Sequence, residues 1–252
     1  MIKVRYGENT AIEESEYYIR LNNTENQYDN PTYTFKVMLY LCSLLTESGL
    51  NENKLIITSN DIHNKLGIMS LKLFDGAINY ISSISYDYKK EFKSKKSHTK
   101  CIWYSVDNII VSHKHFKGYY EIVFSDEFLI LFGRERKQFF YTIPKELLNC
   151  DVRYKVHSVF IGNYILLHQR RNKGKANELI ISIKELIKNC PLLPRYDELG
   201  EDRQVSRAII EPFKNNLDFA CYLLGIKWHY ADTEPNNYMD FIKAKVVLDS
   251  RN

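Results

Sequence analysis

The chain has 252 residues, of which 44% are hydrophobic and 26% charged, a balance typical of soluble globular proteins. Polar residues interrupt the longest apolar runs every few positions, so no stretch is suited to span a bilayer. The first residues lack the apolar segment of a secretory signal, and we expect a cytoplasmic protein. The five cysteines are widely spaced and form no C-x-x-C pair, so neither a disulfide framework nor a zinc site is suggested, and we expect no cofactor.

The net charge of +4 is small, but its distribution along the chain is uneven. Residues 1–30 carry three basic residues against six acids, whereas residues 89–118 carry eight lysines against two acids. Like charges gathered on one segment raise the local potential and favour a polyanionic partner. We interpret residues 1–30 as a polar arm with one strand-like run at Tyr17–Leu21.

Apolar periodicity and turn residues predict the elements of the first half in chain order. Helices are expected over 32–48, 61–66 and 70–83, and Gly49 and Gly67 end the first two of them. A short strand is expected at 55–57. Two further strands, 101–106 and 109–113, form a predicted hairpin around Asp107-Asn108 that follows the lysine-rich stretch Lys89–Lys100.

The second half begins after a strand at 119–124, a helix at 125–132 and an aromatic connector. Its predicted helices cover 154–171, 182–189 and 202–224, with a strand at 179–181 before the second of them. Pro212 lies inside the last helix and should kink or divide it. The runs 226–231 and 238–248 predict a second hairpin.

The two halves repeat one another at a constant offset of 124 residues, so that Lys54–Ile62 returns as Glu178–Leu186. In each copy a short strand leads into a hydroxyl-x-x-acid capping box, Thr58 with Asp61 and Ser182 with Glu185. The repeated order of helix, strand, helix, helix and hairpin is that of a winged helix, whose commonest use is duplex DNA binding. The sequence therefore predicts an α+β protein with an N-terminal polar arm (1–30), two tandem winged-helix domains (31–133 and 151–252) and a connector (134–150).

Residues at the start of the last long helix are the leading candidates for base contacts, because the N-terminal turns of a recognition helix meet base edges. Arginine bonds guanine bidentately, and glutamine bonds adenine. A solvated helix face is the alternative interpretation of this segment. Basic residues nearby would contact phosphate and position the domain, and the lysine-rich stretch is either a phosphate contact or a solvated loop. The predicted contacts are Arg203, Gln204, Ser206, Arg207 and Lys214; Arg170, Arg171, Lys173, Lys175, Ser182 and Lys184; and Ser70, Lys72, Lys93, Lys95 and Lys96.

Catalytic chemistry finds little support in the sequence, and we expect a protein without enzymatic activity. No G-x-x-x-x-G-K-[ST] motif is present, so no ATPase is indicated. His113 and His115 lie on one face of a predicted strand, as metal ligands do in rolling-circle nicking enzymes, and a metal-dependent nicking enzyme is one alternative. A transcriptional regulator and a protein-interaction scaffold are the others.

The chain resembles bacterial plasmid replication initiators of the tandem winged-helix type over roughly residues 31–249. The segments that carry the resemblance are Tyr119–Leu129, Phe140–Pro144, the helix around Tyr164–Leu167 and Ile181–Leu186. The resemblance implies a protein that binds repeated origin sites on double-stranded DNA, melts or bends nearby AT-rich DNA and recruits host replication proteins. It further implies a homodimer formed through the first domain and site reading by Arg203, Gln204, Ser206 and Arg207 of the second.

Overall fold

The structure is a computed structural model, and the part of the chain that it describes has several gaps. The described residues are 2–7, 14–22, 31–49, 51–67, 70–94, 97–106, 108–132, 143–151, 155–172, 179–190, 193–194, 196, 199 and 202–250. Of these, only the backbone is described for 2–7, 14–22, 31, 85–106, 131–132, 171, 202–203 and 250.

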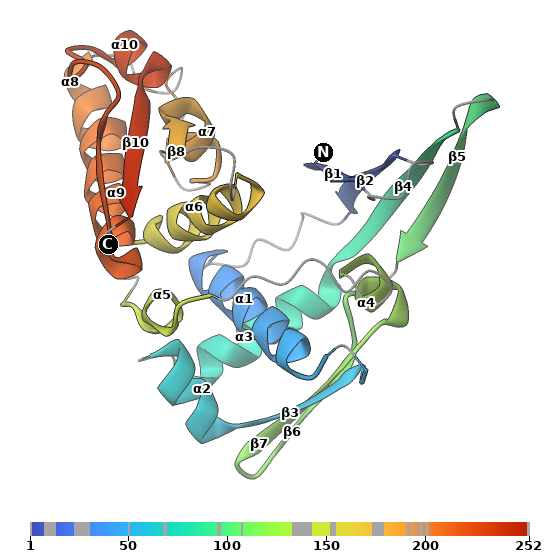
Figure 1. Cartoon of the computed structure of the whole chain (residues 1–252). Helices are drawn as coiled ribbons and strands as arrows, with labels where there is room; N and C mark the ends of the chain where they lie inside the picture. The colour runs from blue at the N-terminus through green and yellow to red at the C-terminus, as the bar shows by residue number, and fades with distance from the viewer. Residues whose placement is uncertain are drawn as a thin grey trace. The chain divides into compact units, whose positions relative to one another are not determined.

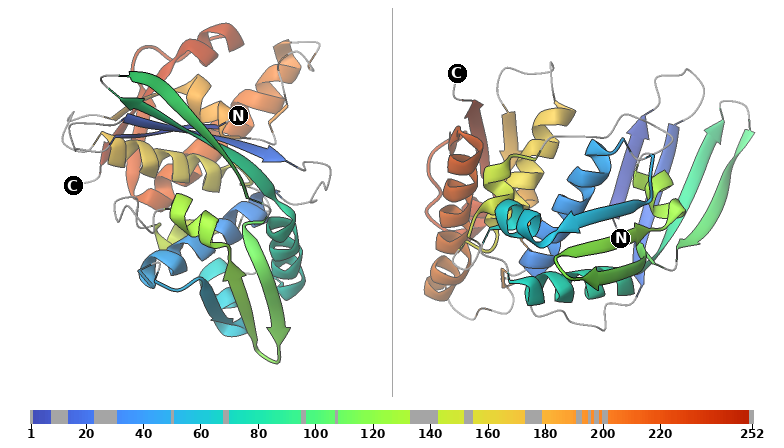
Figure 2. Two further views of the ribbon diagram at one scale, coloured as in Figure 1. Left: turned by 90° about the vertical axis from the view of Figure 1, so that its right-hand side faces the viewer. Right: turned by 90° about the horizontal axis from the view of Figure 1, so that it is seen from below.

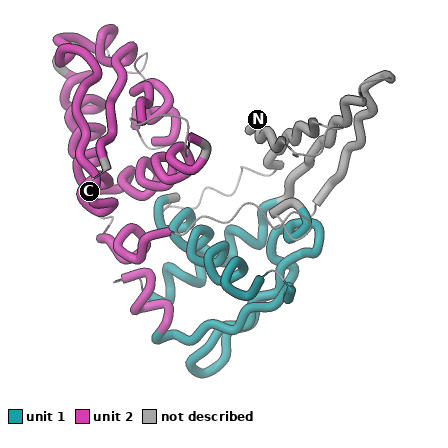
Figure 3. Tube along the Cα trace, viewed as in Figure 1, with its two compact units in different colours: residues 1–60, 70–139 teal, residues 61–69, 140–252 magenta. Residues whose placement is uncertain are grey.

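Two compact units make up the chain, and both combine helices with antiparallel sheet (Figures 1 and 3). One unit contains residues 1–60 and 70–139, and the other contains residues 61–69 and 140–252. Residues 61–69 thus group with the second unit, although they closely follow the strand Lys54–Thr58, which belongs to the first unit. The domain boundaries expected from the sequence remain a prediction.

The repeated segments of the sequence form repeated elements in the structure. The first set is α1 (Pro31–Glu47), β3 (Lys54–Thr58), α2 (Ser59–Leu66), α3 (Leu71–Ser83), β6 (Ile110–Phe116) and β7 (Tyr119–Phe124). The second set is α6 (Ser158–Arg171), β8 (Leu179–Ser182), α7 (Ile183–Lys188), α8 (Asp202–Val205), a π-helical segment (Ser206–Ile210), α9 (Glu211–Leu224), β9 (Ile226–Tyr230), α10 (Tyr238–Lys243) and β10 (Lys245–Ser250). Two short helices, α4 (Asp126–Phe132) and α5 (Lys145–Asn149), lie between the sets along the chain.

The two winged-helix sheets have the same topology, which confirms the predicted fold of two tandem winged-helix domains. Their strand orders are β3-β7-β6 and β8-β10-β9, so in each the last strand lies between the first and the second. Figure 2 shows β3, β6 and β7 side by side. The offset of 124 residues also holds in the structure, since α1 ends at Glu47 and α6 at Arg171.

Each set builds its own core from the apolar faces of its helices and strands. In the first, Leu41, Leu45, Phe74 and Ile78 are fully buried. In the second, one cluster joins residues of α6, β8, α7, α9, α10 and β10, with Phe213 and Phe241 in edge-to-face contact at 5.6 Å. The capping residue Ser182 performs its predicted role, because its hydroxyl accepts a hydrogen bond from the Glu185 backbone N–H at 3.2 Å.

The predicted hairpin around Asp107-Asn108 is wrong. Residues 101–106 lie in β5 (Ser97–Val106), which pairs with β4 (Ser85–Ser94), whereas β6 pairs with β7. The chain reverses instead at Lys117-Gly118, where Gly118 has a φ of +87° that a two-residue hairpin turn accepts readily. The wing of the first unit is therefore the β6–β7 hairpin, whose tip projects beyond the helices of the unit (Figures 1 and 2).

The second predicted hairpin is also wrong in part. Residues 226–230 form β9 as expected, but residues 238–243 form the helix α10, and only residues 245–250 return as a strand. Asn237 explains the helix, because its side chain accepts a hydrogen bond from the Asp240 backbone N–H at 2.9 Å and so caps the first turn. Phe241 then lies buried in the core.

The lysine-rich stretch and the N-terminal arm form a further sheet, of which the backbone is described. Its strand order is β1 (Ile2–Gly7), β2 (Glu14–Asn22), β4 and β5, all antiparallel. The sequence predicted one strand in the arm and no strand over Lys89–Lys100, which was interpreted as a phosphate contact or a solvated loop. Both expectations are corrected, because the arm forms two strands, of which β2 pairs with β4, and residues 89–94 and 97–100 lie in the strands β4 and β5. Lys95 and Lys96 lie outside the described residues.

Pro212 divides the long helix at 202–224, as predicted. The π-helical segment Ser206–Ile210 precedes it, and the Glu211 backbone N–H bonds to the Ser206 carbonyl, five residues back. Buried residues recur every four positions, at Val205, Ile209 and Phe213, although four residues overshoot one α-helical turn by about 40°. A wider π turn takes up this drift and keeps the three side chains in the core.

Among the described helices, none has the length and apolar character needed to cross a membrane.

Candidate nucleic-acid interface

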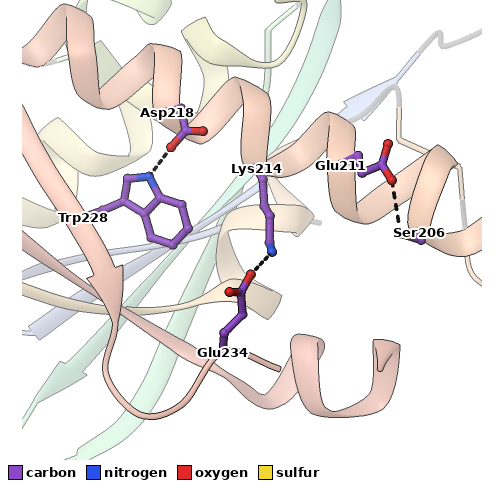
Figure 4. Close-up of polar contacts among 6 residues, drawn as sticks. All are labelled: Ser206, Glu211, Lys214, Asp218, Trp228 and Glu234. Atoms are coloured by element: carbon purple, nitrogen blue, oxygen red, sulfur yellow. Dashed lines mark hydrogen bonds and ion pairs between the residues drawn. The ribbon is translucent and has the colours of Figure 1, made fainter. Parts of the chain in front are cut away.

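The first two turns of the divided helix present polar side chains to solvent. Gln204 and Arg207 are exposed, and neither has a hydrogen-bond or ion-pair partner among the described residues. The Ser206 hydroxyl is half-buried and donates a long, weak hydrogen bond of 3.5 Å to Glu211 Oε1 (Figure 4). For Arg203 only the backbone is described, and it lies in α8. The start of the helix can therefore offer an amide and a guanidinium to an external partner.

Lys214, two turns further along, has an internal partner. Its ammonium forms an ion pair with Glu234 in the loop after β9 and lies 5.5 Å from the centre of the Tyr230 ring (Figure 4). Partial burial acts to lower the pKa of Lys214, but Glu234 and Tyr230 outweigh that effect and raise it, so the ammonium stays charged. On the same helix, Asp218 accepts a hydrogen bond of 2.6 Å from Trp228 Nε1. The later turns of α9 thus bind the β9 region and its loop.

Releasing Lys214 from Glu234 should strengthen DNA binding. We expect Glu234→Gln to raise the affinity for any duplex about threefold at low salt, because a lysine whose charge is neutralised internally attracts phosphate weakly. The slope of log affinity against log salt should steepen by about one, as for one added phosphate contact. Titration of a labelled random duplex at several salt concentrations measures both quantities.

Asp232→Asn is the matched control for this change. Asp232 is an exposed acid in the same loop, so its substitution removes the same charge and leaves the Lys214–Glu234 pair in place. Equal gains from the two variants would show that only the overall charge of the loop matters and would contradict a specific role for the pair.

Buried polar contacts fasten the middle of α9 to the start of α6. The Oδ1 atom of Asn216 accepts hydrogen bonds from the His157 backbone N–H and from the Ser158 hydroxyl, both at 3.0 Å. Its amide group donates to the Pro212 carbonyl at 2.7 Å. Three of the four hydrogen bonds that an asparagine side chain can make are thereby formed, which fixes the helix that carries the candidate contacts. No motif in the sequence indicates this arrangement, since Asn216 resembles the other polar residues of a surface helix.

Burial of His157 should make the second unit sensitive to acid. Its imidazole is buried, Nδ1 has no hydrogen-bond partner in the described structure, and burial lowers its pKa from 6.5 to about 4. Between pH 6.5 and 4 the unfolded chain binds a proton that the folded chain excludes, so stability falls as pH decreases through this window. We expect a loss on the order of 2 kcal/mol, which His157→Gln should abolish. Urea unfolding at pH 7 and pH 4.5 compares the two proteins, and equal losses would contradict the assignment.

The basic turn of the second unit is described only in part. Arg170 is exposed near the end of α6, Arg171 is its last residue, and Lys173 and Lys175 lie outside the described residues. Lys184 is exposed on α7. The Ser182 hydroxyl caps α7, so its oxygen is already used inside the protein.

The matching helix of the first unit offers fewer contacts. Ser70 caps α3 by accepting a hydrogen bond from the Leu73 backbone N–H at 3.3 Å, and Lys72 is exposed. Lys93 lies in β4, in the sheet that the arm completes. The predicted contacts therefore fall on separate elements. Arg203, Gln204, Ser206 and Arg207 share the first turns of the divided helix, whereas Arg170 and Arg171 lie at the end of α6.

The two histidines that suggested a metal site have other neighbours. His113 Nδ1 lies 3.3 Å from the Ser82 hydroxyl, and the His115 ring stacks on Tyr120 at 4.1 Å. Among the side chains that the structure describes, no cluster of three or more His, Cys, Asp or Glu residues could hold a metal ion. The geometry of β6 therefore offers no observation in favour of nicking.

Comparison with known proteins links the chain to a solved structure. The crystal structure of domains 2 and 3 of RctB aligns with a TM-score of 0.52, over 98% of this chain and 90% of that one. The chain has the fold of these two RctB domains. At 11% identity the likeness concerns fold alone, and it extends over both winged-helix units. No protein-family model and no curated protein sequence matches the chain.

Proposed function

We propose that the protein binds duplex DNA in a sequence-specific manner and initiates replication at repeated origin sites, without catalysis of its own. The observation that carries the proposal is the exposed start of the divided helix, where Gln204 and Arg207 have no partner among the described residues. These side chains stand where a winged helix presents its base-reading residues. The sequence resemblance to plasmid initiators and the tandem fold support the role in replication.

Arg207→Ala tests the reading of bases. We expect it to cost about 1–3 kcal/mol on the specific site and to reduce the discrimination against random duplex, because a bidentate contact to one base pair is lost. Binding is titrated on the DNA that flanks the protein's own gene and on random duplex. Arg170→Ala is the control, since a phosphate contact should weaken binding to both duplexes alike. Equal losses on both duplexes for Arg207→Ala would contradict base reading.

Initiation itself needs a second experiment. A circular DNA that carries the flanking repeats and no other origin is introduced into cells with or without the protein. We expect stable transformants only when the protein is supplied, and none with Arg207→Ala. Specific binding without transformants would favour a transcriptional regulator.

The proposal includes a homodimer formed through the first unit and contacts with host replication proteins. Sedimentation of the purified protein tests the dimer.

A further inference from the structure

Two aromatic side chains lie in solvent at the tip of the first unit's wing. Phe116 and Tyr119 flank the Lys117-Gly118 turn, with exposed fractions of 42% and 38%. Their rings stack, with centroids 5.0 Å apart and an angle of 22° between the planes. No other described ring contacts this pair, so the outer π face of the pair is open. The rings stay exposed even though burying them would stabilise the protein.

The register of the sheet places the pair on its outer face. Tyr119 lies opposite Thr58 on β3 and Phe116 on β6, so one row crosses all three strands. Tyr120, the next residue along β7, points to the other face and is buried. Ile56 is 65% exposed in the following row, which shows that the described residues leave this face open.

The surroundings of the pair are positively charged. Lys114 and Lys117 are exposed, and no acidic residue occurs from Asn108 to Tyr120. Glu121 is the nearest acid along the strand, and Lys54 neutralises it through an ion pair of 2.7 Å. The tip therefore offers a flat aromatic surface with an excess of two positive charges, one from each exposed lysine.

The tip is held in place by the rest of the sheet. The Gly118 carbonyl accepts a hydrogen bond of 2.9 Å from the Ser59 backbone N–H, which ties the turn to the start of α2. A side chain added at Gly118 would meet nothing within 4 Å, so the turn stands clear of neighbouring atoms. A partner can therefore reach a surface that is already formed.

We infer that the Phe116–Tyr119 pair binds unpaired bases of single-stranded DNA. Every base has a π face that stacks on aromatic rings, and nearby lysines attract the phosphate backbone. In a duplex these faces are covered by the neighbouring base pairs, so the pair selects separated strands. The surface differs from the duplex-reading helix of the second unit and adds a second form of DNA to the proposed function.

The full-length protein and a fluorescently labelled oligothymidine of about ten nucleotides test this inference by anisotropy titration. We expect Phe116→Ala and Tyr119→Ala each to weaken binding about tenfold, Tyr119→Phe to retain it, and Lys117→Gln to reduce its salt dependence. Val111→Ala is the control, because it removes an apolar side chain that is 62% exposed on the same strand. Thermal unfolding confirms that each variant is folded.

Duplex binding measured on the same variants separates the two proposals. Loss of oligothymidine binding with unchanged affinity for the flanking duplex supports the inference, whatever the duplex specificity proves to be. Unchanged oligothymidine binding in the Phe116→Ala, Tyr119→Ala double variant overturns it. A double variant that keeps oligothymidine binding but changes from dimer to monomer would assign the aromatic pair to contact with a second copy and likewise overturn it.

Discussion

Replacing Asn216 by alanine should destabilise the second unit by about 3 kcal/mol. The substitution leaves the His157 backbone N–H and the Ser158 hydroxyl without their shared acceptor, and both residues are buried. An unsatisfied buried polar group costs about 1–3 kcal/mol, and the loss of the bond to the Pro212 carbonyl adds to this. Urea unfolding at pH 7 measures the change.

The adjacent residue provides the control. Asn215 is exposed on the same helix, and the only described bond at this position uses its backbone carbonyl, which accepts from Lys155 Nζ at 3.3 Å. Asn215→Ala should therefore change stability by less than about 0.5 kcal/mol. If Asn216→Ala were as mild as Asn215→Ala, water or a rearranged side chain would have to satisfy the buried groups, and α9 would not depend on this contact.

The sequence alone predicted the elements whose signals are local. The strand and capped helix at Leu179–Lys188 follow from a short run of apolar residues and from a hydroxyl three positions before an acid. The division of the long helix follows from Pro212, because proline has no backbone N–H to donate within a helix and its ring clashes with the preceding turn. These features depend on residues within one or two turns, so the printed sequence contains all of the information needed.

Strand partners were harder to predict because pairing depends on segments far apart in the chain. Residues 101–106 were correctly expected to form a strand, but their partner is β4 and not residues 109–113. The alternation of apolar and polar residues shows which face of a strand is apolar, but it does not show which strand pairs with it. The helix α10 was missed for a related reason, since Tyr238, Phe241 and Ile242 fit a strand run as well as a helix face.

The helix that carries the candidate contacts was predicted from the sequence, but its internal contacts were not. The sequence correctly placed a helix at Asp202 with Gln204 and Arg207 in its first turns, and both are exposed. It grouped Lys214 with them, although Glu234, twenty residues away, binds this lysine. The aromatic pair at the first wing was not found, because its rings meet only when the chain turns at Gly118.

Gly67→Ala should cost about 3 kcal/mol of stability, for two separate reasons. Gly67 follows α2 with a φ of +74°, and alanine in this left-handed region is strained by about 1 kcal/mol. A Cβ atom at Gly67 would also lie 2.7 Å from the Asn149 backbone oxygen at the end of α5, so the backbone itself would have to move. Overpacking of this kind typically costs about 1–3 kcal/mol.

Gly225→Ala separates the two contributions. Gly225 ends α9 with a φ of +66°, and a Cβ atom there would meet nothing within 4 Å. This variant carries the backbone strain without the collision, so we expect a loss of only about 1 kcal/mol. The difference between the two variants in urea unfolding is then the cost of the contact between the end of α2 and Asn149. Equal losses would mean that the two chain segments separate without cost, and that the short distance at Gly67 does not contribute to the stability of the fold.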